Sequence, residues 1–145
     1  MCAKINPKTG KMQNNNQCEL LLKMTIQHKT MFVFACIMMS CAIVLDAMGA
    51  HALSKFLNQQ QLSIWSIAGR YLLIQSLALL VLSLLSESKI LNISLKMITF
   101  GVLAFSLSLY TLCFIQIPYL GLLTPIGGVS MLMGWLGVIL SVIKK

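Results

Sequence analysis

Four long apolar runs are the feature that most constrains what this chain can fold into. They lie at about residues 30–50, 64–85, 95–116 and 120–143, and each reaches the roughly 20 residues that a helix needs to cross a bilayer core about 30 Å thick. Unpaired backbone groups cannot face lipid, so each run is predicted to be a helix. The links between the runs are short, which favours antiparallel neighbours. The sequence therefore predicts an all-α membrane protein with four transmembrane helices in an up-down antiparallel bundle.

The composition indicates the same class of protein. Of the 145 residues, 58% are hydrophobic and 10% are charged, whereas a soluble domain carries about 25% charged residues. A chain this apolar would have too little polar side chain to cover a water-facing surface. Four buried helices of a soluble protein are therefore the less favoured alternative.

Lysine placement predicts how the helices are oriented. Lysines gather before the first run, in the link between the second and third runs, and at the C-terminus, whereas the first link has only Lys55 and the third has none. By the positive-inside rule, both termini and the middle link are expected to be cytoplasmic, in a bacterial inner (plasma) membrane. The net charge of +8 also attracts anionic lipid, so the lipid bilayer is the first expected partner. Nucleic acid is not expected, because the basic residues form no stripe interleaved with aromatics.

The N-terminal segment differs from the rest of the chain. Residues 1–29 are polar, basic and rich in asparagine, which predicts a disordered tail before a transmembrane domain at residues 30–145. An alternative stays open, in which translation begins at Met24 and residues 1–23 are not part of the protein.

Residues that carry chemistry are few and scattered. Cys36 and Cys41 lie five apart on one predicted helix, roughly 140° around its axis, so they cannot chelate one metal together. Neither CxxC nor HExxH occurs, and these are the patterns typical of such metal sites. There is also no nucleophile–base set, no pair of carboxylates and no cofactor motif. We expect no metal site, no cofactor and no enzymatic activity.

Small residues repeat along one face of each predicted helix. Such faces let membrane helices approach closely, so helix packing is the first interpretation of them. A second copy of the chain, or another membrane protein, would use the same kind of face. The residues are Ala42 and Gly49 in the first run, Gly69 and Ser76 in the second, Gly101 and Ser108 in the third, and Gly127, Gly128, Ser130, Gly134 and Gly137 in the fourth.

Asp46 and Arg70 are charged residues well inside the first two runs. Asp46 shares the small-residue face of its run, so it is predicted to look into the bundle. Because the first two helices run antiparallel, both charges should lie at similar depth, and each alone costs roughly 2.5–3.5 kcal/mol at a helix centre. We predict an ion pair between them. The alternative, in which Arg70 snorkels to the outer head groups, stays open.

The start of the fourth helix has two interpretations. Thr124 and Pro125 suit the N-cap and the first helical position, but the helix could also begin near Tyr119 and kink at Pro125. Trp65 and Tyr119 fall at predicted outer boundaries, where an aromatic belt is expected.

Four motifs, in order, carry a resemblance to a known family. They are GAHALSK after the first run, W…Y near the start of the second, FSLSLYTL in the third and LLTPIGGVSMLMGW in the fourth. With them, the chain from about Met31 to Ile143 resembles the YgdD-like family of small inner-membrane proteins, of the DUF423 or UPF0382 type, which is related to mitochondrial membrane proteins of animals. The resemblance implies a four-helix architecture and an inner-membrane location, but no reaction. Asp46, Gln75 and Leu107 stand where that family commonly has a small residue, a histidine and a glycine.

Two classes of function remain open. The first is a structural or interaction protein that packs with itself or with another membrane protein, which predicts a dry interior and an exposed small-residue face. The alternative is a component of a small-molecule or ion transporter or channel that acts as an oligomer, which predicts a pocket around Asp46, since intramembrane ionisable residues are candidate functional sites. The polar cluster of this alternative would comprise Asp46, His51, Arg70, Ser106, Tyr110 and Thr124.

Overall fold

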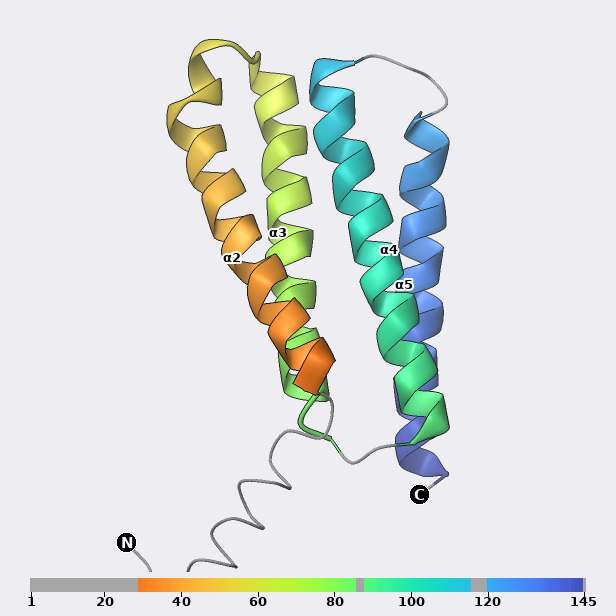
Figure 1. Ribbon diagram of the computed structural model, residues 1–145. Helices are drawn as coiled ribbons and strands as arrows, with labels where there is room; N and C mark the ends of the chain where they lie inside the picture. The colour runs from red at the N-terminus through yellow and green to blue at the C-terminus, as the bar shows by residue number, and fades with distance from the viewer. Residues whose placement is uncertain (1–28, 86–87, 116–119, 145) are drawn as a thin grey trace, which may run out of the picture.

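The computed structural model describes residues 29–85, 88–115 and 120–144. Over these ranges the chain forms four α-helices and one short 3-10 helix, and all four α-helices are long and apolar enough to cross a membrane (Figure 1). The predicted all-α class with four membrane-spanning helices is thereby confirmed. The elements are α2 (Lys29–His51), η1 (Leu53–Lys55), α3 (Gln59–Leu82), α4 (Lys89–Phe114) and α5 (Leu120–Ile143).

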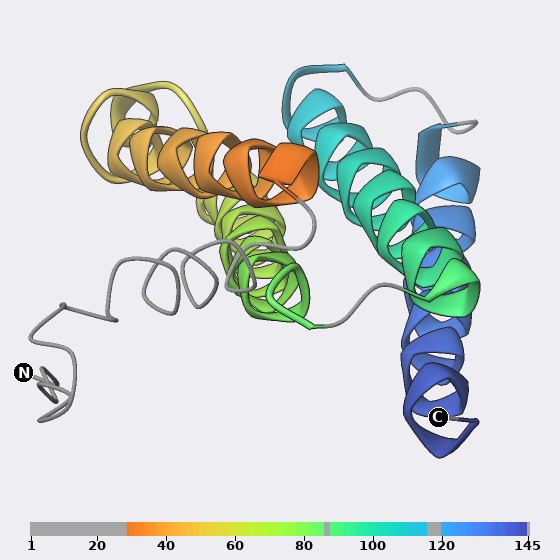
Figure 2. The same ribbon diagram turned by 60° about the horizontal axis from the view of Figure 1, so that its bottom comes forward.

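The helices alternate in direction and stand side by side in chain order. The start of α2, the α3–α4 link and the end of α5 lie at one end of the molecule, and the other two links lie at the opposite end (Figure 1). Each helix packs chiefly against its neighbours in the chain, and α4 with α5 most extensively. Figure 2 shows α2 and α5 at opposite edges. The up-down antiparallel order is as predicted, and the row is open at its two edge helices.

Helices α3 and α4 begin earlier than the predicted ranges 64–85 and 95–116. Asn58 Oδ1 accepts a hydrogen bond of 2.8 Å from the Gln61 N–H, and Gln61 Oε1 accepts one of 2.9 Å from the Asn58 N–H, so the two residues form a capping box at the start of α3. Ser88 Oγ accepts a 3.1 Å bond from the Leu91 N–H at the start of α4. The predicted starts were late because hydropathy marks where a helix becomes apolar, whereas these caps mark where it begins.

Helix α5 begins at Leu120, and Pro125 lies inside it. The prediction that Thr124 is the N-cap is therefore wrong, and the start agrees with the alternative near Tyr119, a residue outside the described ranges. Thr124 Oγ1 instead lies 2.8 Å from Ser108 Oγ of α4. A threonine hydroxyl inside a membrane helix can form a hydrogen bond with a neighbouring helix. The N-cap interpretation did not consider this role.

Backbone contact through glycine holds α4 against α5. A Cβ added at Gly101 would lie 2.7 Å from the Gly127 carbonyl oxygen, and one at Gly127 would lie 2.7 Å from the Phe105 backbone nitrogen. Further along, a Cβ at Gly134 would lie 2.5 Å from Ile98 Cγ1, and one at Gly137 would collide with Ser94. The glycine face of α5 is thus used within the molecule.

Two other members of the predicted packing face of α5 differ from each other. Ser130 Oγ donates a 3.0 Å hydrogen bond to the Met97 carbonyl of α4. Gly128 makes no such contact, because a Cβ there would meet nothing within 4 Å. The prediction that Gly128 packs against a helix is wrong, since it lies about 100° around the axis from Gly127.

Candidate functional site

Trp65 of α3 builds the contact between α2 and α3. Its ring is 5% exposed and lies over Gly49, where a Cβ would come within 2.5 Å of Trp65 Cδ1. Its indole Nε1 donates a 2.8 Å hydrogen bond to the Leu45 carbonyl of α2. The prediction that Trp65 belongs to an aromatic belt is wrong, because Gly49 makes room for the ring inside the molecule. Ala42, Gly69 and Ser76, predicted packing residues, are likewise buried in α2 and α3.

The contact between α3 and α4 combines aromatic and polar groups. The rings of Trp65 and Tyr110 are 4.4 Å apart between centroids, and Ser106 Oγ donates a 3.2 Å hydrogen bond to the Ala68 carbonyl. Nearer the α2–α3 link, Gln61 Nε2 donates a 2.9 Å bond to the Cys113 carbonyl. Ser106 and Tyr110 therefore lie on the side of α4 that faces α3.

Asp46 lies beside a surface cavity between α2 and α3. The cavity has a volume of about 280 Å³, and we call it the α2–α3 groove. Asp46 itself is exposed, and its Oδ1 is 3.4 Å from the position that a Cβ of Gly69 would occupy. The sequence predicted that Asp46 would look into the bundle. It faces the groove and α3, but it is exposed and is not enclosed by helices. The lining residues are Asp46, Gly49, Ala50, Ser54, Leu62, Trp65 and Ser66.

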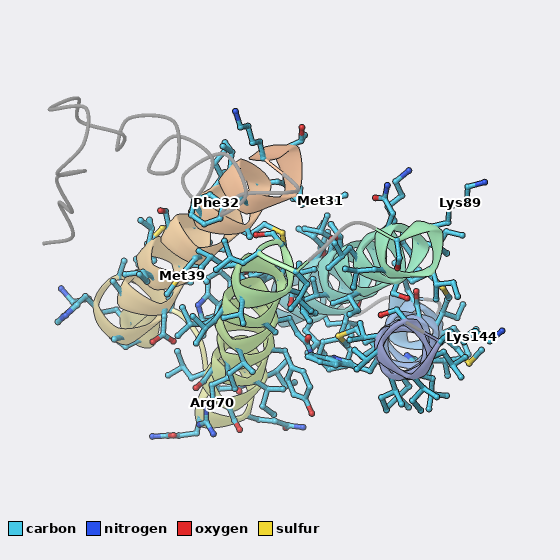
Figure 3. The ribbon with its side chains drawn as sticks, turned by 90° about the horizontal axis from the view of Figure 1, so that it is seen from below. Met31, Phe32, Met39, Arg70, Lys89 and Lys144 are labelled. Atoms are coloured by element: carbon cyan, nitrogen blue, oxygen red, sulfur yellow. The ribbon has the colours of Figure 1, made fainter. Side chains whose placement is uncertain are left out.

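Arg70 does not pair with Asp46. No nitrogen–oxygen distance between the two side chains is within 4.0 Å, and Arg70 Nη2 lies 3.4 Å from Ser66 Oγ, one turn closer to the α2–α3 link. Figure 3 places Arg70 at the outer surface of α3. The predicted ion pair is wrong because Arg70 lies about 100° around the helix from Gly69, the residue that Asp46 approaches. Two opposite charges therefore flank the groove without neutralising each other.

Tyr110 brings a buried hydroxyl close to Gly69, outside the lining of the groove. The residue is 8% exposed, and its Oη has no hydrogen-bond partner among the described residues. This oxygen is 3.5 Å from the Cβ position at Gly69, the same position that Asp46 Oδ1 approaches. A buried polar group without a partner costs about 1–3 kcal/mol. Gly69 is therefore approached by both a carboxylate of α2 and a hydroxyl of α4.

The predicted polar cluster of six residues is not one site. Asp46 and Tyr110 approach Gly69, and Ser106 lies nearby against Ala68. Arg70 follows Gly69 in the chain, but its side chain lies at the outer surface of α3 beside Ser66. His51 is exposed at the end of α2, and Thr124 lies against Ser108 between α4 and α5. The sequence grouped all six as one polar cluster, but the row separates the α2–α3 contact from the α4–α5 contact.

Sequence reasoning missed two polar links between helices. Gln61 joins α3 to α4, and its pattern Asn-x-x-Gln is a capping-box signature that the sequence does show. Gln75 Oε1 accepts a 3.2 Å hydrogen bond from Trp135 Nε1 of α5, beside a second cavity of about 240 Å³. No sequence signal pairs Gln75 with Trp135. Within the described ranges, no three His, Cys, Asp or Glu residues gather as a metal site would require.

Comparison with known proteins gives consistent results. The family model described as "Protein of unknown function (DUF423)" matches residues 45–128, more than half of the chain. A UPF0382 membrane protein of Staphylococcus epidermidis is 38% identical over 105 residues, which cover 71% of this chain and 86% of the relative. One of Staphylococcus haemolyticus is 37% identical over 111 residues, covering 75% and 89%. One of Staphylococcus saprophyticus is 36% identical over 105 residues, covering 71% and 88%. No solved structure matches the chain.

Proposed function

Because the chain belongs to the DUF423/UPF0382 family of membrane proteins, we propose that it acts as a structural, partner-interacting protein of the bacterial inner membrane. In this proposal, it forms a homo-oligomer through the outward face of α2. The observation that carries the proposal is a difference between the two edge helices of the row. Small residues mark helix–helix contacts in membranes, because they let two backbones approach closely. Large aliphatic side chains are as well accommodated by lipid tails as by another helix, so they do not mark such a contact.

Helix α5 exposes a face suited to lipid. Its outward side chains are almost all large and aliphatic, and the described ones include Leu122, Ile126, Val129, Leu132, Met133, Leu136, Ile139 and Leu140. Helix α2 differs, because Ser40, Cys41, Ala47 and Ala50 are exposed along with larger residues. Ser40 and Ala47 are seven residues apart and so lie on nearly the same side of α2. A second helix can approach α2 more closely there than it can approach α5.

A second copy of the chain is the occupant that this face fits. A two-fold axis parallel to the helices would set Ser40 and Ala47 of each copy against the same face of the other, as isologous dimers require. The glycine face of α5 is already used against α4, so it does not compete as an interface. The α2 face supports dimerisation without any change in the fold.

The charges support an orientation with both termini in the cytoplasm. Helix α4 begins with Lys89 and α5 ends just before Lys144, both at the end of the molecule where α2 begins with Lys29 (Figure 1). Lys55 lies at the opposite end, in η1. The positive-inside rule assigns the lysine-rich end to the cytoplasm.

A transporter or channel component is the second candidate, and the α2–α3 groove favours it. The groove brings a carboxylate to a cavity at membrane depth, about 7.5 Å from the end of α2 at a helical rise of 1.5 Å per residue. This feature indicates a binding site more directly than a route across the bilayer. An oligomer that closes the groove on its open side would be needed for transport.

Disulfide cross-linking in native membranes tests the proposed interface. The experiment starts from a variant in which serine replaces Cys2, Cys18, Cys36 and Cys41. Cys113 is kept, because it is 1% exposed and cannot reach a second copy. Ala47→Cys should form a covalent dimer under mild oxidation, whereas Val129→Cys, on the outward face of α5, should not. Equal cross-linking of both variants, or of neither, would contradict an interface on α2.

A further inference from the structure

The α2–α3 groove holds two opposite charges that do not meet. The Asp46 carboxylate lines it, and the Arg70 guanidinium lies 3.4 Å from the hydroxyl of Ser66, which also lines it. Intramembrane charges are normally paired or turned to water. A ligand that carries both a positive and a negative group would complement both ends of this groove at once.

The Asp46 end of the groove carries a hydrogen-bond acceptor. Asp46 is exposed and lines the groove, whereas Tyr110 Oη, although it is also close to Gly69, is buried and does not line it. A primary ammonium has three N–H donors and can donate to the carboxylate. A trimethylammonium has no N–H and cannot hydrogen-bond to it. The carboxylate therefore favours a primary ammonium.

The Arg70 end suits an anion of phosphate type. Guanidinium groups bind phosphate through two parallel hydrogen bonds, which fixes orientation as well as charge. The volume of about 280 Å³ accepts a small polar group but not a whole lipid. Exposed apolar side chains of α2, including Ile43, continue the same surface, so an attached acyl chain would still lie against lipid.

We propose that the α2–α3 groove binds a zwitterion made of a phosphate and a primary ammonium, with the ammonium at Asp46 and the phosphate at Arg70. The group occurs both as the head group of phosphatidylethanolamine and as free phosphoethanolamine. Binding needs only α2 and α3 of one copy, so it does not depend on the proposed dimer.

Native mass spectrometry of the full chain tests this, with equal amounts of phosphatidylethanolamine, phosphatidylcholine and phosphatidylglycerol of identical acyl chains. The wild type should retain phosphatidylethanolamine about tenfold over either other lipid, a difference equivalent to one charge-assisted hydrogen bond. Asp46→Asn should bring the ratio of phosphatidylethanolamine to phosphatidylcholine close to one. Equal retention of the three lipids by the wild type, with no binding of free phosphoethanolamine, overturns the proposal.

Matched variants separate binding from folding. Arg70→Gln should weaken retention of phosphatidylethanolamine, whereas Lys55→Gln, which removes the same charge from the exposed η1 segment, should not. An unchanged preference for phosphatidylethanolamine in Asp46→Asn, with a melting temperature equal to that of the wild type, also overturns the proposal.

A competition experiment identifies the source of the zwitterion. Soluble phosphoethanolamine is added to protein in nanodiscs that contain phosphatidylethanolamine. If phosphoethanolamine displaces the lipid, the free solute is an occupant of the groove. If the lipid is retained, the occupant is the lipid head group. Equal retention of the three lipids, with no binding of free phosphoethanolamine, in a protein that still cross-links through Ala47→Cys would overturn the groove proposal alone.

Discussion

At the scale of single residues, Gly69 shows how a missing side chain can create a polar site. Its backbone lets Asp46 of α2 and Tyr110 of α4 approach the same position, although the two residues are 64 apart in the chain. The small-residue face of α3 was predictable, because such faces are how membrane helices pack. The absence of a pair between Asp46 and Arg70 was not predictable, because a helical wheel puts Arg70 at the edge of the packing face but does not fix the direction in which its long side chain bends.

Alanine substitutions should distinguish a glycine that contacts the backbone of a neighbouring helix from a glycine with free space beside it. Gly101→Ala is expected to destabilise the fold by about 1–3 kcal/mol, because the added methyl overlaps backbone atoms of Gly127 and Met131. Gly128→Ala, which meets nothing within 4 Å, should be neutral or stabilise by up to about 1 kcal/mol through helix propensity. Unfolding by SDS titration in mixed micelles measures the stability of both variants. Equal changes in stability for the two would contradict the packing described.

The indole of Trp65 should contribute through its hydrogen bond. Trp65→Phe retains most of the ring contacts but leaves the Leu45 carbonyl without this donor, so we expect a loss of about 0.5–1.5 kcal/mol. The smaller ring adds a packing loss to this figure. Trp135→Phe makes the same substitution at a less buried tryptophan whose bond, to Gln75, is longer at 3.2 Å, so it should cost less. A Trp65→Phe protein as stable as the wild type would show that the bond is not formed in the membrane.

At the scale of the helices, the positions where α3 and α4 begin follow from capping chemistry. The apolar runs located all four helices, but the starts of α3 and α4 depend on Asn58 and Ser88, polar residues outside the runs. The capping box of α3 is visible in the sequence, so its start could have been predicted. The start of α5 could not be separated from its alternative, because Thr124 suits both an N-cap and a contact with Ser108.

Removal of one cap should measure its contribution. Asn58→Ala is expected to lower stability by about 1 kcal/mol, since it leaves the Gln61 N–H without its acceptor. Asn92→Ala is the control, because Asn92 is an exposed residue in the first turns of α4. Chemical denaturation in detergent distinguishes the two, and an equal or larger loss for Asn92→Ala would contradict the capping role.

At the scale of the whole molecule, the fold and the family were both predictable. Hydropathy sets the number of spans, short links set the antiparallel order, and the four motifs indicate the DUF423/UPF0382 type, which the comparisons confirm. The open row and the groove were not predictable. Both depend on which neighbours each helix contacts, and periodic small residues do not say whether a face is used within one chain or between two.

Fusion reporters test the orientation of the row. Green fluorescent protein fused after Lys145 should fluoresce, and alkaline phosphatase inserted after Phe56, in the α2–α3 link, should be active, because the positive-inside rule puts the lysine-rich end in the cytoplasm. Inactive phosphatase at Phe56 together with active phosphatase after Lys145 would reverse the proposed orientation without changing the fold.

The mass of the protein in native lipid is the most direct test of the central claim that α2 presents an interface to a second copy. Particles extracted with the surrounding bilayer should contain twice the 16.0 kDa mass of one chain. Ala47→Leu should return them to a single chain, because a large side chain holds the two α2 helices apart, while Val129→Leu on α5 should leave the dimer intact. A wild-type protein that is monomeric in lipid, or a dimer that Ala47→Leu does not weaken, would contradict the account.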